Sequence, residues 1–230
     1  LFATTYFLNL YLIEIRFLSP VVSGTVFVSF AVTVTVVSGL AGLYITEFGS
    51  YRWSIWFGWL INTASLGSLM LLSPTTFLPG IVFACALAGI GHGFLLTGHQ
   101  VASQAPCAPD DLPFASAIFG TMRSFGFFLG IAVGGALFQL LLAHQVDHFD
   151  VSRTTAADVT ALTLSLRSFP SGPEKDLLLG ACDWTFRYIW AVLTGVSGLG
   201  MLSSFFVAEV SLDRDTKVVS SQWSSSSTLV

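Results

Sequence analysis

Long apolar runs, separated by short polar or proline-containing breaks, dominate the pattern of this chain. A helix needs about 20 apolar residues to cross the hydrocarbon core of a bilayer, and five runs reach that length. The run at the start of the chain is shorter, and we interpret it as the second half of a truncated span. The pattern predicts helices at about 1–13, 21–46, 52–72, 77–103, 114–142 and 186–208.

One stretch inside the second run has the alternation of a β-strand. Residues 32–36 read Val-Thr-Val-Thr-Val, and β-branched residues favour strands. A membrane barrel needs strands of about 10 residues separated by turns, whereas this run continues without a turn well beyond that length. A lone strand also leaves its backbone amides unsatisfied in lipid. We therefore expect a helix here, and an all-α membrane protein overall.

The breaks between the runs contain turn-forming residues. Ser19-Pro20, Ser73-Pro74 and the segment 106–113 interrupt the apolar pattern, and proline is a strong signal for a turn or a helix end. Because most links are short, successive helices are expected to be antiparallel neighbours. The whole of 1–208 is therefore predicted to form one transmembrane bundle.

Two segments depart from this pattern because they are polar. Residues 143–185 hold six Asp and Glu residues and are predicted to form a long loop. Within it, Thr155 and Asp158 are a candidate capping box for a short amphipathic helix, and an irregular loop is the alternative. Residues 209–230 have too little apolar surface to fold alone and are predicted to be disordered.

The composition supports a membrane protein. The chain is 53% hydrophobic and 10% charged, whereas soluble domains carry about 25% charged residues. This small number of charges cannot cover a water-exposed surface. The composition therefore excludes a soluble globular domain, and the expected partner is the lipid bilayer. No basic patch suggests a nucleic-acid partner. The chain begins inside an apolar run without an initiator methionine, and we expect it to be a fragment of a longer protein.

Arg123 is the only full charge inside a complete span. A mid-helix arginine costs at least ~2.5 kcal/mol on membrane-insertion scales. We therefore expect its guanidinium to face the bundle interior or a water-filled path, with Gln104 or the backbone carbonyls that end the preceding helix as partners. Asp110 and Asp111 in the adjoining loop are further candidates if that loop folds back. The alternative is that the side chain extends to the membrane interface.

Other polar and small residues are weaker candidates. His92 and His99 are seven residues apart and share a helix face, so they either line a polar path or are satisfied interior residues. Gly126, Gly130 and Gly134 are spaced by four, which is typical of close helix packing. The sequence contains no nucleophile–base pair, metal-ligand spacing or phosphate-binding loop. We therefore expect no catalytic, cofactor or metal site, and no enzyme.

An ordered set of residues over most of 8–139 resembles the major facilitator superfamily. The most similar group is the fourteen-helix drug:proton antiporters, which includes many fungal toxin and multidrug efflux pumps. One part of the set resembles that group's copy of the superfamily's cytoplasmic loop motif, although Thr46 and Glu47 replace the usual acid and base. The matching residues are Leu8, Leu10, Tyr11, Ser19-Pro20 and Ser23-Gly24, then Gly42, Gly49, Tyr51 and Arg52, then Gly89, Gly91, Gly93, Gln104, Asp110-Asp111, Ala115, Ala117, Arg123, Ser124, Gly126, Gly130 and Ala132.

The resemblance implies a C-terminal six-helix bundle whose partner is the missing N-terminal half of the same transporter. It implies proton-coupled efflux of small amphiphilic molecules across the plasma membrane or the vacuolar membrane, with the loop at 143–185 outside and the tail in the cytoplasm. Arg123, His92, His99 and Gln104 then become candidates for the substrate pathway or its gating. The alternatives are a siderophore or metabolite carrier of the same fold, and a membrane scaffold or receptor that does not transport.

Overall fold

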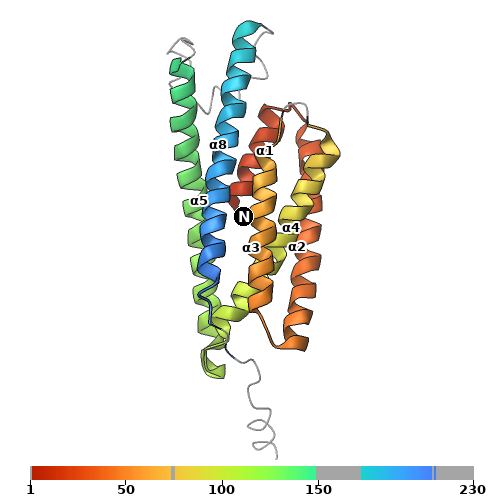
Figure 1. The fold of residues 1–230 in the computed structure, drawn as a ribbon, viewed down its shortest axis with the longest axis vertical. Coiled ribbons are helices and arrows are strands. Elements are labelled where there is room, and N and C mark those ends of the chain that lie inside the picture. Colours follow the sequence, from red (N-terminus) through yellow and green to blue (C-terminus); the bar gives the residue numbers. More distant parts are fainter. Residues whose placement is uncertain (1, 74–75, 149–171, 209, 211–230) are drawn as a thin grey trace, which may run out of the picture.

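The computed structural model describes residues 2–73, 76–148, 172–208 and 210. These residues form an elongated bundle of long helices that run up and down alongside one another (Figure 1), and no strand is found among them. The all-α prediction is confirmed, including a helix where the Val-Thr alternation occurs. The elements are α1 (Phe2–Glu14), α2 (Pro20–Phe48), α3 (Arg52–Leu69), α4 (Leu78–Gln104), the 3₁₀ helix η1 (Pro109–Asp111), α5 (Leu112–His148) and α8 (Pro173–Ser204).

The ends of α2 show how the local sequence sets the helix boundaries. The Ser19 hydroxyl accepts a hydrogen bond from the Val22 amide at 3.4 Å, and Pro20 occupies the first turn, where its missing N–H is no loss. At the other end, Gly49 has a φ of 66°, and its N–H donates to the Ile45 carbonyl at 2.9 Å. Glycine adopts this left-handed conformation most readily. The position of Gly49 in the sequence therefore predicts where α2 ends and the turn into α3 begins.

Helices α5 and α8 both extend into the segment that was predicted to be a long loop. Helix α5 continues to His148, and α8 begins at Pro173, so both ends of the predicted 143–185 loop are helical. The start of α8 is amphipathic despite its acidic residues. Its apolar face includes Leu178, Cys182 and Ile189, which are buried. The capping-box candidate at 155–158 and most of the 209–230 tail lie outside the described residues.

Three of the described helical segments are long and apolar enough to cross a membrane, at Pro20–Phe48, Leu78–Gln104 and Pro109–Gln145. The sequence pattern predicted five complete spans. Helix α3 has 18 residues, which is about 27 Å of helix, and it includes several polar side chains. Helix α8 is long, but its first half carries charged residues. Both helices nevertheless pack within the bundle beside the three clear spans.

Helix α4 lies between α2 and α3, and glycines allow the close approach on both sides. A β-carbon added to Gly89 would lie 2.8 Å from the Phe30 carbonyl oxygen of α2, and one added to Gly91 would lie 2.7 Å from the Asn62 amide nitrogen of α3. No other residue type fits at these two contacts. The three helices therefore form one tightly packed layer.

The glycine stripe of α5 faces α1. Gly134 lies under the ring of Phe7, and a β-carbon on Gly130 would lie 3.5 Å from the Ala3 side chain. The spacing of four on both helices means that α1 and α5 run in the same direction. Gly126 has open space within 4 Å among the described residues. An added β-carbon would therefore collide at Gly134, make an ordinary contact at Gly130 and meet no described atom at Gly126.

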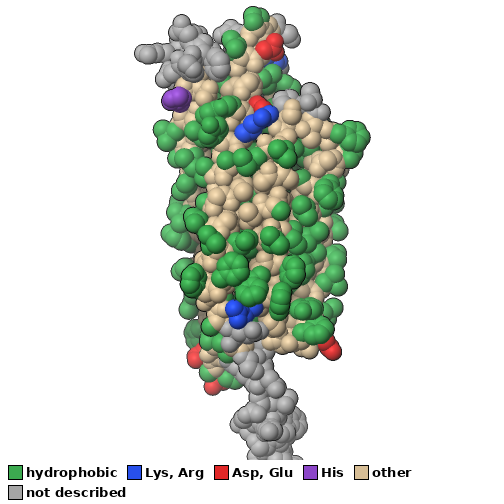
Figure 2. Space-filling view, in the orientation of Figure 1, with side chains coloured by type: hydrophobic (Ala, Val, Ile, Leu, Met, Phe, Trp, Pro, Cys, Tyr) green, Lys and Arg blue, Asp and Glu red, His purple; other side chains and the backbone are tan. Residues whose placement is uncertain are grey.

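Two apolar clusters hold the bundle together, one near each end. The larger cluster joins α1, α2, α3, α4, α5 and α8, and contains Tyr11, Phe138 and Trp190. The smaller cluster surrounds Tyr51 and Ile55 at the start of α3. Outside these clusters, hydrophobic side chains cover the long side of the molecule, and charged groups gather near its two ends (Figure 2). This is the surface of a protein solvated by lipid along its length.

Candidate functional site

A cavity of about 310 Å³ lies among α3, α4 and α5. It occupies the stretch of α4 between the two apolar clusters. Helix α4 contributes residues within 78–85 to the larger cluster and its contacts, and residues 101–102 to the contacts of the smaller one. It is therefore near the middle of the bundle's length, away from both ends. The lining residues are Trp59, Asn62, His92, Leu95, Leu96, His99, Phe119, Met122, Arg123 and Phe127.

The two histidines enter the cavity from the same side of α4. His92 is 6% exposed. The Nδ1 atom of His92 lies 2.9 Å from the Ala88 carbonyl, and that of His99 lies 2.8 Å from the Leu95 carbonyl. A carbonyl only accepts hydrogen bonds, so each neutral ring carries its proton on Nδ1 and presents Nε2 as an acceptor. Both rings also make edge contacts with aromatic residues, Phe30 and Trp59 respectively.

Asn62 is a buried polar residue of the cavity wall that sequence reasoning missed. Its Nδ2 donates to the Ser197 hydroxyl of α8 at 2.9 Å. Its Oδ1 is buried and has no hydrogen-bond partner among the described residues. A buried acceptor without a partner is unfavourable unless a ligand or water supplies a donor. The available signal was an amide in the middle of a run whose other uncharged polar residues are small hydroxyl side chains.

Arg123 reaches the cavity from α5, whereas the histidines come from α4. Its guanidinium lies 5.6 Å from the centre of the Phe127 ring, one helical turn further along. Arg123 is exposed in the chain by itself, and no hydrogen bond from its side chain to a described residue is seen. The prediction that it pairs with Gln104 or with the carbonyls ending α4 is therefore wrong. Three of the four predicted pathway residues, Arg123, His92 and His99, do line one cavity.

Gln104 has a different place. Its Nε2 donates to the Ser116 hydroxyl at 2.8 Å, which ties the end of α4 to the start of α5 across η1. Gln104 is not part of the cavity lining, because its amide is directed to the link between the two helices. It acts here as a connection between helices.

The predicted loop-motif residues gather around the α2–α3 turn. Gly42 is inside α2, where a β-carbon would lie 3.8 Å from the Thr97 side chain of α4. Gly49 ends α2, and Arg52 begins α3 with its guanidinium 4.9 Å from the centre of the Trp56 ring. These residues therefore shape a turn at one end of the bundle and lie away from the cavity.

Known proteins similar to this chain are fungal membrane transporters. No protein-family model matches the chain. A Phoma protein named MFS transporter L2 is 31% identical over 217 residues, which are 93% of this chain and 36% of that protein. MFS efflux transporter aclA of Aspergillus oryzae is 28% identical, over 85% of this chain and 36% of that protein. MFS-type efflux pump LUC4 of a Fusarium species is 26% identical, over 92% of this chain and 39% of that protein.

These relatives extend over nearly the whole of this chain, yet the chain spans only 36–39% of their length. The abbreviation in their names denotes the major facilitator superfamily, whose members are carriers and not enzymes. The helical bundle, its apolar surface and the ordered residues noted in the sequence agree with this assignment. The chain is therefore an integral membrane protein that belongs to the major facilitator superfamily of transporters.

Proposed function

We propose that this chain forms one half of a proton-coupled exporter of small amphiphilic molecules, and that the cavity among α3, α4 and α5 is part of the substrate path. The observation that carries the proposal is the composition of the cavity wall. Polar groups from three helices meet there, midway along an otherwise apolar bundle. In transporters built from repeated halves, substrate binds near the bilayer midplane.

The cavity wall supports a particular class of substrate. Aromatic side chains such as Trp59, Phe119 and Phe127 supply flat apolar surface. Asn62 Oδ1 and the histidine Nε2 atoms are hydrogen-bond acceptors, and Arg123 is a donor with a positive charge. A molecule with an apolar or aromatic body, a hydroxyl or amino group on one side and an anionic or carbonyl group on the other would satisfy all of them. This agrees with the efflux activity named for relatives such as aclA and LUC4.

Two features favour transport over a scaffold or receptor without transport. A scaffold would be expected to have a closed, uniformly apolar interior, whereas this bundle contains a cavity with an unsatisfied buried acceptor, Asn62 Oδ1. The histidines also present two Nε2 acceptors to the same cavity. We propose them as participants in proton coupling.

The proposal is tested by filling the cavity in the full-length transporter. Leu96→Trp places an indole in the cavity, whereas Phe83→Trp enlarges a side chain of α4 that is 69% exposed and outside it. Each variant is expressed in yeast lacking its own efflux pumps, and export of fluorescent aromatic weak acids is measured with and without a protonophore. We expect Leu96→Trp to abolish export, Phe83→Trp to retain it, and the protonophore to stop it. Normal export by Leu96→Trp at normal expression would contradict the proposal.

A further inference from the structure

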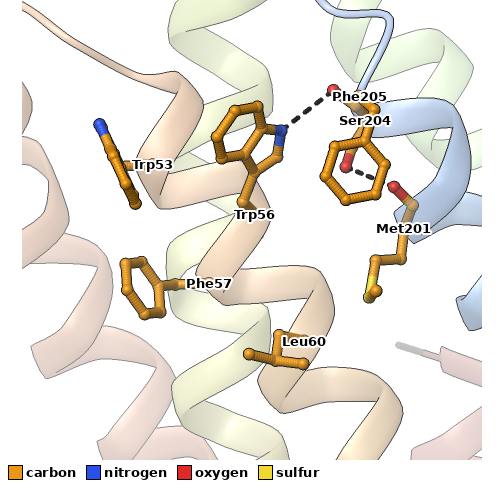
Figure 3. Close-up of a pocket in the computed structure, with 7 residues that line it drawn as sticks. All are labelled: Trp53, Trp56, Phe57, Leu60, Met201, Ser204 and Phe205. Atoms are coloured by element: carbon orange, nitrogen blue, oxygen red, sulfur yellow. Dashed lines mark hydrogen bonds between the residues drawn. The ribbon is translucent and has the colours of Figure 1, made fainter.

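A second hollow, separate from the cavity, lies on the outer surface of α3 and α8 (Figure 3). Its volume is about 200 Å³. One wall is built from the first turns of α3 and the other from the last turns of α8, and Figure 3 shows the aromatic rings standing around the space between them. We call it the aromatic groove, and it is lined by Trp53, Trp56, Phe57, Leu60, Met201, Ser204 and Phe205.

The groove offers hydrocarbon surface to an occupant. The Trp56 indole N–H donates to the Ser204 carbonyl at 3.2 Å, and the Ser204 hydroxyl donates to the Met201 carbonyl at 2.6 Å. These two polar groups are thus engaged within the wall, and the remaining contacts are aromatic or aliphatic. The groove therefore selects an apolar chain and has little to offer a polar solute.

The groove opens to the lipid and lies at the depth of a membrane interface. Phe57, Leu60 and Phe205 are each about half exposed, at 49%, 53% and 52%. Helix α3 begins at Arg52, and α8 ends at Ser204, so the groove lies where both helices reach the end of the bundle. Tryptophan is enriched at this level in membrane proteins because its ring meets both apolar chains and polar headgroups.

A positive charge stands at the rim of the groove. The Arg52 guanidinium lies 4.9 Å from the centre of the Trp56 ring, whose other atoms line the hollow. This places a cation beside an apolar channel at the headgroup level. A zwitterionic headgroup, whose ammonium offsets its phosphate, gains less from that cation than a headgroup with net negative charge.

From the apolar lining, the lipid-facing opening and the cation at the rim, we infer that the aromatic groove binds one acyl chain of an anionic phospholipid, with its phosphate near Arg52. The occupant is a membrane lipid because the groove is open along the surface that faces the bilayer. The bound lipid would pack α3 against α8 at the end of the bundle. This site is distinct from the proposed substrate path.

The inference is tested by lipid photocrosslinking of the full chain in vesicles of phosphatidylcholine that contain a small fraction of phosphatidylglycerol with a diazirine on its acyl chain. Labelled peptides are mapped by mass spectrometry. We expect adducts to concentrate at residues 53–60 and 201–205, and unlabelled phosphatidylglycerol to compete on the order of five-fold better than phosphatidylcholine, as expected for one cation near an anionic headgroup.

Substitutions separate a site from general lipid contact. Arg52→Gln should remove most of the five-fold preference, whereas Arg52→Lys should retain it. The control is Arg187→Gln, which alters an arginine on α8 with a 49% exposed side chain outside the groove. Leu60→Trp, which fills the groove, should lower labelling there, while Leu199→Trp, on an exposed position outside it, should not. Three outcomes would each overturn the inference. Labelling could be spread evenly over the exposed apolar helices, the lipid preference could be unchanged in Arg52→Gln, or the groove could be unlabelled because another protein segment covers it.

Discussion

The buried Tyr51 hydroxyl donates a hydrogen bond to the Ala208 carbonyl at 2.8 Å, across the end of the bundle. The same hydroxyl accepts a hydrogen bond from the Val210 amide at 3.0 Å. Tyr51 is 1% exposed and belongs to the turn between α2 and α3. One side chain therefore fastens the segment that follows α8 to the turn that carries the predicted loop motif.

Tyr51→Phe should destabilise the chain while leaving the shape of the side chain unchanged. The substitution removes both hydrogen bonds made by the hydroxyl, and we expect a loss of about 1–3 kcal/mol, seen as a lower melting temperature in detergent. The control is Tyr44→Phe, because Tyr44 is 44% exposed and makes no hydrogen bond with the described residues. Equal melting temperatures for the two variants would show that the two hydrogen bonds of the Tyr51 hydroxyl contribute nothing to stability.

Gly134 should be far less tolerant of substitution than Gly126. A β-carbon on Gly134 would collide with the ring of Phe7, which is itself 1% exposed and packed against Phe138. Gly134→Ala should therefore destabilise the chain by about 1–3 kcal/mol, the usual effect of overpacking. Gly126→Ala should be neutral or slightly stabilising, since the space there is open among the described residues and alanine favours helix. Thermal unfolding in detergent compares them directly, and a reversed order would refute the α1–α5 contact.

Features that depend on local chemistry were predictable from the sequence. The start of α2 at Ser19-Pro20 and its end at Gly49 follow from capping and from the left-handed residue. The shared face of His92 and His99 follows from helical periodicity alone. The start of α8 was missed because charged residues outweighed the apolar spacing in a search based on long uncharged runs.

Features that depend on how helices meet were not predictable. Arg123 lies on α5, and only the packing of the bundle brings it to the same cavity as His92 and Asn62. The length of the run that holds Trp59 and Asn62 marks it as a membrane span, but length does not indicate which of its residues face a cavity. The expected pairing of Arg123 with Gln104 is not formed, because the Gln104 amide donates to the Ser116 hydroxyl near the start of α5.

Cysteine labelling should place the two ends of the bundle on opposite sides of the membrane. The end of α5 and the start of α8 lie at one end of the bundle, while the α2–α3 turn and the end of α8 lie at the other (Figure 1). We expect Thr160→Cys to react with an impermeant maleimide added outside intact cells, and Ser220→Cys to react only after permeabilisation. A Cys107→Ser background limits unwanted signal, because the other two cysteines are buried. Labelling of position 220 from outside would contradict the orientation.

The chain alone should not transport. In the proposed architecture, substrate is held between two halves, and this chain covers only 36% of the Phoma relative. Reconstitution of residues 1–230 in proteoliposomes with an imposed proton gradient should therefore give no saturable uptake of aromatic weak acids. The full-length transporter, reconstituted in the same way, is the positive control. Gradient-driven uptake by residues 1–230 would disprove the requirement for a second half.

Arg123 is the residue whose substitution best separates a substrate contact from a membrane anchor. Its guanidinium reaches the cavity over the Phe127 ring and makes no hydrogen bond with the described residues, so its donors are open to an anionic or carbonyl group of a substrate. A hydrogen bond to a charged group contributes about 1.5–3 kcal/mol. We therefore expect Arg123→Ala in the full-length transporter to lower export on the order of ten-fold or more.

Arg123→Lys should retain part of the export, because it keeps the positive charge while losing the forked geometry of the guanidinium. The control is Arg187→Ala. Arg187 lies on α8, outside the cavity, and pairs with Asp183 one helical turn before it. An exposed ion pair of this kind contributes about 0–1 kcal/mol to stability. Export is measured at matched surface expression. An arginine that only reached for the membrane interface would tolerate alanine nearly as well as lysine, so full export by Arg123→Ala would assign the residue to that role and remove it from the substrate path.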